Sequence, residues 1–104
     1  MSNNKRDGGL DLKDKNKQEF KRPKKYKVIL YNDDYTPMEY VVLLLIQEFH
    51  MSEKKAFSIM MSIHNSGKGI AGVYSKEIAE TKAVNCNLIS KNLGYPLLCD
   101  IQPE

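Results

Sequence analysis

YKVILYNDDYTPME occupies residues 26–39 and predicts the first two secondary-structure elements of the fold. Residues 26–31 form a short stretch that is rich in aromatic and β-branched residues, which is typical of a β-strand. Asn32, Asp33 and Asp34 follow, and these residue types favour turns because their short side chains bond to nearby backbone groups. The stretch therefore predicts a strand that runs into a polar loop.

The residues after the loop predict a helix over residues 37–49. Thr36 suits the N-cap, Pro37 suits the first helical position, and Glu39 suits the reciprocal site of a capping box. The helix continues through the apolar run 40–46. A run of that kind predicts burial on most of the helix surface.

The rest of the chain continues as an alternation of helices and strands. Apolar residues recur at helical spacing and capping residues mark the helix ends. The predicted elements are a helix from Ser52 to residue 65 stopped at Gly67, a strand over 69–74, a helix over 75–92 stopped at Gly94, and a strand over 97–101. The order predicts an α+β fold, β-α-α-β-α-β, with a small three-stranded antiparallel sheet packed against three helices.

Charge divides the chain into two parts. Residues 1–25 hold nine Lys/Arg and four Asp/Glu, a balance of +5, and the remaining 79 positions of the 104 carry a balance of −2. A segment this poor in apolar residues cannot offset its ordering entropy. We therefore predict a flexible basic tail over residues 1–25 and one folded domain over residues 26–104.

Composition narrows the class of protein and its compartment. The longest apolar run, residues 40–46, is too short to span a bilayer, and the polar start has no secretory signal. Cys86 and Cys99 show neither metal-ligand nor redox spacing, so the two thiols suit a reducing compartment. These features predict a cytoplasmic protein without a membrane partner. Acidic residues interrupt the lysines of the tail, which argues against a nucleic-acid arm.

The candidate functional residues are those of the polar loop and one histidine. Carboxylates and an amide oxygen suit a cation, above all an ammonium group with three hydrogens to donate. Asn32, Asp33 and Asp34 could supply such acceptors, and His64 is a second, separate candidate. The same residues also fit a simple turn and a helix end, and the local pattern alone leaves both interpretations open.

Several ordered motifs resemble the ClpS family, the adaptors of the Clp protease in the N-degron pathway. They are residues 32–39 (NDDYTPME), His64, residues 72–74 (GVY), residues 77–82 (EIAETK) and residues 96–99 (PLLC). The resemblance covers about residues 25–102. It implies an adaptor that binds the free N-terminus of proteins beginning with Phe, Tyr, Trp or Leu. Such an adaptor delivers these proteins to a ClpA- or ClpC-type unfoldase and thereby modulates the substrate choice of the protease.

The resemblance also implies roles for individual residues. The α-ammonium of the bound protein would meet Asn32, Asp34 and His64, with Asp33 and Thr36 alongside. The apolar pocket would be lined or supported by Pro37, Met38, Val41, Met60, Ile63 and Leu97, with Met38 as the gate against β-branched residues. Glu77 and Lys82 would contact the unfoldase, and the tail would engage it during delivery.

Some positions depart from the common family pattern. Tyr31 stands where an aliphatic residue is usual, Tyr40 replaces a common Phe, and Tyr95 stands where His often precedes Pro-Leu. None is among the central ammonium-binding positions. The departures leave the ranking of Phe, Tyr, Trp and Leu open.

Two other classes of function would also use some of these residues. A scaffold domain like the C-terminal domain of the ribosomal stalk protein would use the polar loop only as a cap. A metal-dependent hydrolase could use Asp33, Asp34 and His64, but the ligand set is sparse and no nucleophile motif is present. We therefore expect a monomeric adaptor with no enzymatic activity, no cofactor, no metal and no nucleic-acid partner.

Overall fold

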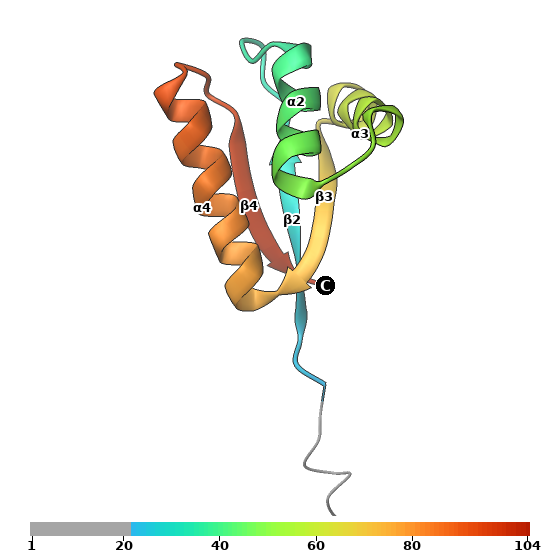
Figure 1. The fold of residues 1–104 in the computed structure, drawn as a ribbon, viewed down its shortest axis with the longest axis vertical. Coiled ribbons are helices and arrows are strands. Elements are labelled where there is room, and N and C mark those ends of the chain that lie inside the picture. The colour runs from blue at the N-terminus through green and yellow to red at the C-terminus, as the bar shows by residue number, and fades with distance from the viewer. Residues whose placement is uncertain (1–21) are drawn as a thin grey trace, which may run out of the picture.

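The computed structural model describes residues 22–104 of the chain (Figure 1). The prediction of a flexible tail over residues 1–25 therefore falls largely outside the described residues. The elements are β2 (Lys25–Tyr31), α2 (Met38–Phe49), α3 (Glu53–Ser66), β3 (Lys68–Ser75), α4 (Lys76–Asn92) and β4 (Leu98–Pro103). Their order, β-α-α-β-α-β, confirms the predicted succession, and each boundary lies within two residues of its expected place.

β2 is the central strand of a three-stranded sheet of order β3-β2-β4, and both pairings are antiparallel. Successive side chains of a strand point to opposite faces, so Val28 and Leu30 share one face of β2. Both are fully buried in a core to which all three helices contribute. The helices therefore pack against one face of the sheet, as predicted (Figure 1).

The start of α2 corrects one prediction. The N-cap residue is Pro37 in an extended conformation, and no side chain caps the helix. The Thr36 hydroxyl donates to Asp33 Oδ2 at 2.6 Å. Thr36 is therefore not the N-cap, because its hydroxyl is already committed to the loop that precedes the helix.

The exposure of α2 corrects a second prediction in part. Val41, Leu44 and Leu45 are buried, but Leu43 is 53% exposed. α2 contacts α3, α4 and the sheet on its inner side only, so its outer side faces water. The predicted burial therefore holds for most of the apolar run 40–46, but not for Leu43.

Two other predicted helix signals are confirmed. The Ser52 hydroxyl accepts a hydrogen bond from the Lys55 amide at 3.1 Å and so caps α3. Gly67 ends α3 with a φ of 93°, a left-handed conformation that glycine adopts without steric cost. This end of α3 matters because it positions His64, one turn earlier, at the edge of the fold.

Two of the residues that depart from the family pattern contact each other. The rings of Tyr40 and Tyr95 lie 4.8 Å apart between centroids. The Tyr40 hydroxyl also shares a hydrogen bond of 2.9 Å with Ser90 Oγ, and Ser90 is fully buried. Burial raises the pKa of Tyr40, although the bond to Ser90 acts in the opposite direction. This contact ties the start of α2 to the end of α4.

The two thiols, Cys86 on α4 and Cys99 on β4, are free and buried. A hydrogen bond to Cys86, together with burial, raises the pKa of the Cys99 thiol. Such thiols act as small apolar residues of the core rather than as reactive groups. Among residues 22–104, no helix combines the length and the apolar character needed to cross a bilayer.

Candidate functional site

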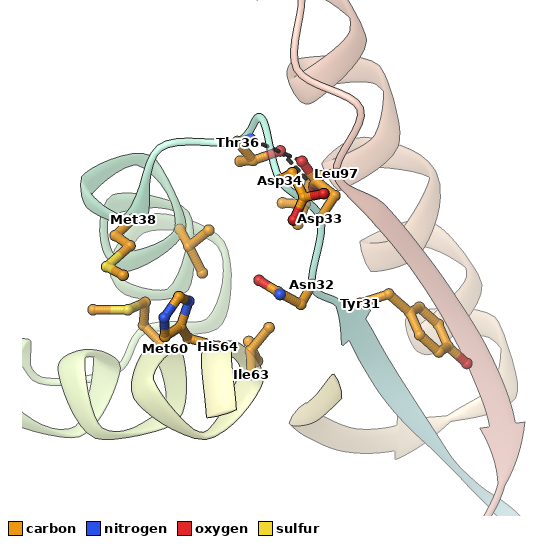
Figure 2. A pocket seen from close by; sticks show the side chains of 11 residues that line it. Tyr31, Asn32, Asp33, Asp34, Thr36, Met38, Met60, Ile63, His64 and Leu97 are labelled. Carbon is orange, nitrogen blue, oxygen red and sulfur yellow. Dashed lines mark hydrogen bonds between the residues drawn. The ribbon is translucent and has the colours of Figure 1, made fainter. Parts of the chain in front are cut away.

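A pocket of about 230 Å³ opens at the end of β2, where the polar loop joins α2 (Figure 2). Pockets for drug-sized ligands usually measure 300–1,000 Å³, so this one suits a single side chain rather than a larger molecule. The lining residues are Tyr31, Asn32, Asp33, Asp34, Thr36, Met38, Val41, Met60, Ile63, His64 and Leu97. They come from β2, the loop, α2, α3 and the residue before β4.

The pocket brings together nearly all of the residues expected to form it. Of the predicted set, only Pro37 is not a lining residue. Pro37 supports the pocket instead, since its carbonyl accepts from the amides of Tyr40 and Val41 at the start of α2. Tyr31 lines the pocket without having been assigned a role there. Its position next to Asn32 in the sequence could have indicated that it lines the pocket. Its ring points away from the other labelled side chains (Figure 2).

Asp33 organises the loop that forms the rim of the pocket. Its Oδ1 accepts from the backbone amides of Tyr35 and Thr36, both at 2.8 Å, and its Oδ2 accepts from the Thr36 hydroxyl. Burial acts to raise the pKa of Asp33, but these three hydrogen bonds outweigh it and hold that pKa below its ordinary value. Both oxygens of Asp33 are thus used within the loop.

The loop is also fixed to the end of α3. The Asn32 amide donates to the Gly67 carbonyl at 2.9 Å, and Gly67 is the C-cap of α3. This bond brings Asn32 and His64 to the same edge of the fold. In Figure 2 the Asn32 side chain points toward the cavity that His64 borders on the opposite side.

Three polar side chains at the rim remain available to a ligand. Asn32, Asp34 and His64 are exposed. Within residues 22–104, no hydrogen bond engages the side chain of any of the three. An amide oxygen, a carboxylate and a neutral imidazole nitrogen are all hydrogen-bond acceptors. The rim therefore offers a converging set of acceptors.

The floor of the pocket is apolar and rigid. It is formed by Val41, Met60, Ile63 and Leu97, each at most 6% exposed. Gly69 on β3 fixes Ile63 from behind, because a Cβ at Gly69 would lie 2.7 Å from Ile63 Cγ1. The backbone of β3 can thus approach α3 closely and hold Ile63 against the cavity.

Met38 stands at the entrance of the pocket. It is the first residue of α2 and is 42% exposed, in contrast to the buried floor. Figure 2 shows Met38 beside Met60 on the side of the cavity away from the loop. A flexible thioether side chain in this position can cover an entering group.

The charge of the pocket favours a cation. Two carboxylates, Asp33 and Asp34, line it, and its lining contains neither lysine nor arginine. Within the described part of the chain, no group of three or more His, Cys, Asp or Glu side chains could hold a metal ion. An organic cation with an apolar side chain, such as an N-terminal residue with its α-ammonium, matches both parts of the pocket.

The two residues expected to contact an unfoldase lie on α4, away from the pocket. Glu77 and Lys82 border a separate depression with Ile78, Thr81 and Asn85. The Lys82 ammonium donates to the Glu48 carbonyl near the end of α2. It also lies 5.8 Å from the ring centroids of both Phe49 and Tyr74. Lys82 therefore also joins α4 to α2, in addition to any contact with a partner.

Comparisons with known proteins agree with this geometry. A family model described as "ATP-dependent Clp protease adaptor protein ClpS" matches residues 21–100. The chain is 45% identical over 85 residues to the ATP-dependent Clp protease adapter protein ClpS of Lawsonia intracellularis (strain PHE/MN1-00), which covers 82% of this chain and 78% of that protein. It is 44% identical over 94 residues to the adapter protein of the same name from Vibrio atlanticus (strain LGP32), covering 90% and 89% respectively.

A solved structure is also similar to the fold. It is described as the structure of Agrobacterium tumefaciens ClpS2 bound to L-phenylalaninamide. The TM-score is 0.78 at 44% sequence identity, and the likeness covers 80% of this chain and 100% of that one.

Proposed function

Because the chain belongs to the ClpS family of Clp protease adaptors, which are not enzymes, we propose that it binds the free N-terminus of proteins. The proteins bound begin with Phe, Tyr, Trp or Leu. They are delivered to a ClpA- or ClpC-type unfoldase for degradation. The observation that carries this proposal is the pocket itself, which joins an apolar floor to a rim of free acceptors.

The rim suits an α-ammonium group. A free α-amino group has a pKa of about 7.7–8.0 and is mostly protonated at neutral pH. Its three hydrogens need three acceptors, and Asn32, Asp34 and His64 supply them. Asp33 and Thr36 act alongside by holding the loop in shape, since their own polar groups bond to each other.

Selectivity for a free terminus follows from the same groups. An acetylated or internal residue has no ammonium and would leave Asp34 without its counter-charge. A buried polar group that is left unsatisfied costs about 1–3 kcal/mol, and the cost at Asp34 is smaller because solvent reaches it. The first side chain adds affinity, because full burial of a large apolar group contributes about 1.5–3 kcal/mol.

The ligand of the similar Agrobacterium structure supports this assignment. L-phenylalaninamide carries a free amino group and a phenyl ring on adjacent carbon atoms. These are the two features that the rim and the floor of the present pocket match. The pocket volume of about 230 Å³ also suits one large side chain.

Delivery would use surfaces remote from the pocket. We assign Glu77 and Lys82 on α4 to the unfoldase contact, and residues 1–25 to a tail that engages the unfoldase. Lys82 has hydrogens to spare, because an ammonium has three and the structure gives one to Glu48. The domain of residues 26–104 would act as a monomer in the cytoplasm.

Fluorescence anisotropy with a labelled peptide that begins with Phe tests the proposal. The same peptide with an acetylated N-terminus is the matched control. Binding of the free peptide alone supports recognition of the ammonium. Equal binding of both peptides, or binding of neither, contradicts the proposal.

A further inference from the structure

A second apolar depression adjoins the pocket, in the angle between α2 and α3. This groove measures about 680 Å³ and is lined by Met38, Glu39, Val42, Leu43, Glu53, Phe57 and Met60. Leu43 is 53% exposed and Phe57 is 56% exposed. Large apolar side chains that gather at the surface of a small domain indicate a surface that binds something.

The groove lies next to the pocket. Met38 and Met60 line both cavities, so the two methionines form a shared wall. Each residue of an extended chain spans about 3.3–3.6 Å. A polypeptide whose first side chain fills the pocket, and which leaves across Met38, therefore reaches the groove with about its second to fourth residues.

The charge of the groove limits what can occupy it. Glu39 and Glu53 lie at its rim, and no lysine or arginine belongs to its lining. Each of the two acids stands in the first turn of its helix, α2 or α3. A basic residue near this rim gains attraction from both carboxylates, whereas an acidic residue is repelled.

We infer that the groove binds the residues that follow the N-terminal residue of a delivered protein, and that it selects apolar and basic ones. The inference rests on the proposed function, because the pocket must hold the first residue. Leu43 and Phe57 would contact a large apolar side chain, and Glu39 and Glu53 would attract a neighbouring Lys or Arg. The adaptor would thus recognise several N-terminal residues of the bound protein rather than one.

Two labelled peptides of equal length test the inference. Both begin with Phe, and residues 2–4 are Arg-Leu-Arg in one and Glu-Ser-Glu in the other, with identical residues beyond. We expect the full chain to bind the first about tenfold more tightly in an anisotropy titration. The double variant Leu43→Gln/Phe57→Gln should lose the part of this preference that comes from the leucine, and Glu39→Gln/Glu53→Gln should lose the part that comes from charge. Leu88→Gln removes a similarly exposed leucine of α4 outside the groove and should retain the preference.

The possible failures can be told apart. L-Phenylalaninamide, added as a competitor, reports on the pocket alone because it lacks residues 2–4. If it competes and the wild-type chain binds both peptides equally, the groove assignment is wrong and the pocket assignment survives. If it does not compete and neither peptide binds, the proposed function is wrong as well. A dimer in sedimentation that the double variant abolishes would assign the groove to a second copy and overturn the inference.

Discussion

Asp33 and Thr36 close the rim loop on itself, because the Thr36 hydroxyl donates to Asp33 Oδ2 at 2.6 Å and the Thr36 amide donates to Oδ1 at 2.8 Å. The loop is therefore built before any ligand arrives. Its neighbour Asp34 is exposed and takes part in no such bond within the described residues. Of these two adjacent acids, Asp33 has a structural role, and Asp34 is left for the binding role proposed above.

Asp33→Asn should lower the free energy of unfolding near neutral pH by about 1–2 kcal/mol, because its hydrogen bonds lose a charged acceptor. The pKa of Asp33 is lowered in the folded chain, so its contribution is present above the unfolded pKa and is lost as pH falls through the folded pKa. Urea unfolding of both proteins between about pH 7 and pH 2 measures this. The two stabilities should converge in acid. A difference that stays constant with pH would contradict the role given to the Asp33 charge.

Asp34→Ala should weaken binding of a Phe-initiated peptide by about tenfold, because the ammonium loses its counter-charge. The effect stays moderate because Asp34 is exposed and solvent screens its charge. The free energy of unfolding should barely change, in contrast to Asp33→Asn. A titration that gives wild-type affinity would remove Asp34 from the ammonium site.

Met38→Ala should admit peptides that begin with Val or Ile, with affinities at least about tenfold above those of the wild-type chain. A β-branched residue carries two heavy atoms on Cβ and cannot rotate them away from the entrance. Met38 is exposed and begins α2, so the change should leave the core intact. Binding of a Phe-initiated peptide is the internal reference, and continued rejection of both Val and Ile would show that Met38 is not the gate.

Tyr40→Phe should lower the free energy of unfolding by about 1–2 kcal/mol, because it leaves the buried Ser90 hydroxyl without the partner seen here. Ser90→Ala in the same chain removes the unpaired group and should recover part of the loss. A double-mutant cycle measured by urea unfolding gives the coupling between the two residues. Additive effects would mean that the hydrogen bond contributes nothing to stability.

Deletion of residues 2–20 should leave peptide affinity unchanged and slow delivery to the unfoldase. Residues 22–25 lead into β2 at the end of the sheet opposite the pocket, so the tail joins the domain far from the bound peptide (Figure 1). Anisotropy measures the first effect, and degradation of a Phe-initiated substrate by the complete protease measures the second. Loss of peptide binding on truncation would contradict the prediction that the tail serves delivery and not peptide binding.

Much of the fold and of the site could be predicted because local signals agreed with one another. The six elements follow from apolar periodicity, from the Ser52 cap and from Gly67. The pocket residues follow from family motifs that recur in a fixed order along the chain, although their binding roles stay predictions.

The remainder depended on contacts that no local pattern contains. Thr36 could cap α2 or bond Asp33, and only the folded loop selects between them. The exposure of Leu43 depends on which side of α2 meets the other layers. The packing of Tyr40 on Tyr95 joins residues from distant parts of the sequence, so two separate departures from the family pattern lie in contact.

The position of β2 determines how the domain carries mechanical force. β2 runs from Lys25 at one end of the sheet to the pocket at the other, with hydrogen-bonded neighbours on both sides. Its bonds lie across the strand axis. A pull at residue 22 that is resisted at the pocket by residues of α3 and by Leu97, which lead into β3 and β4, would load both ladders in shear and strain many bonds at once. The start of β2 and the end of β4 meet where the Glu104 amide donates to the Lys25 carbonyl at 2.8 Å. A pull between Lys25 and Glu104 would instead separate β4 from β2 one pair at a time, so we expect the domain to resist force less in this direction than between residue 22 and the pocket.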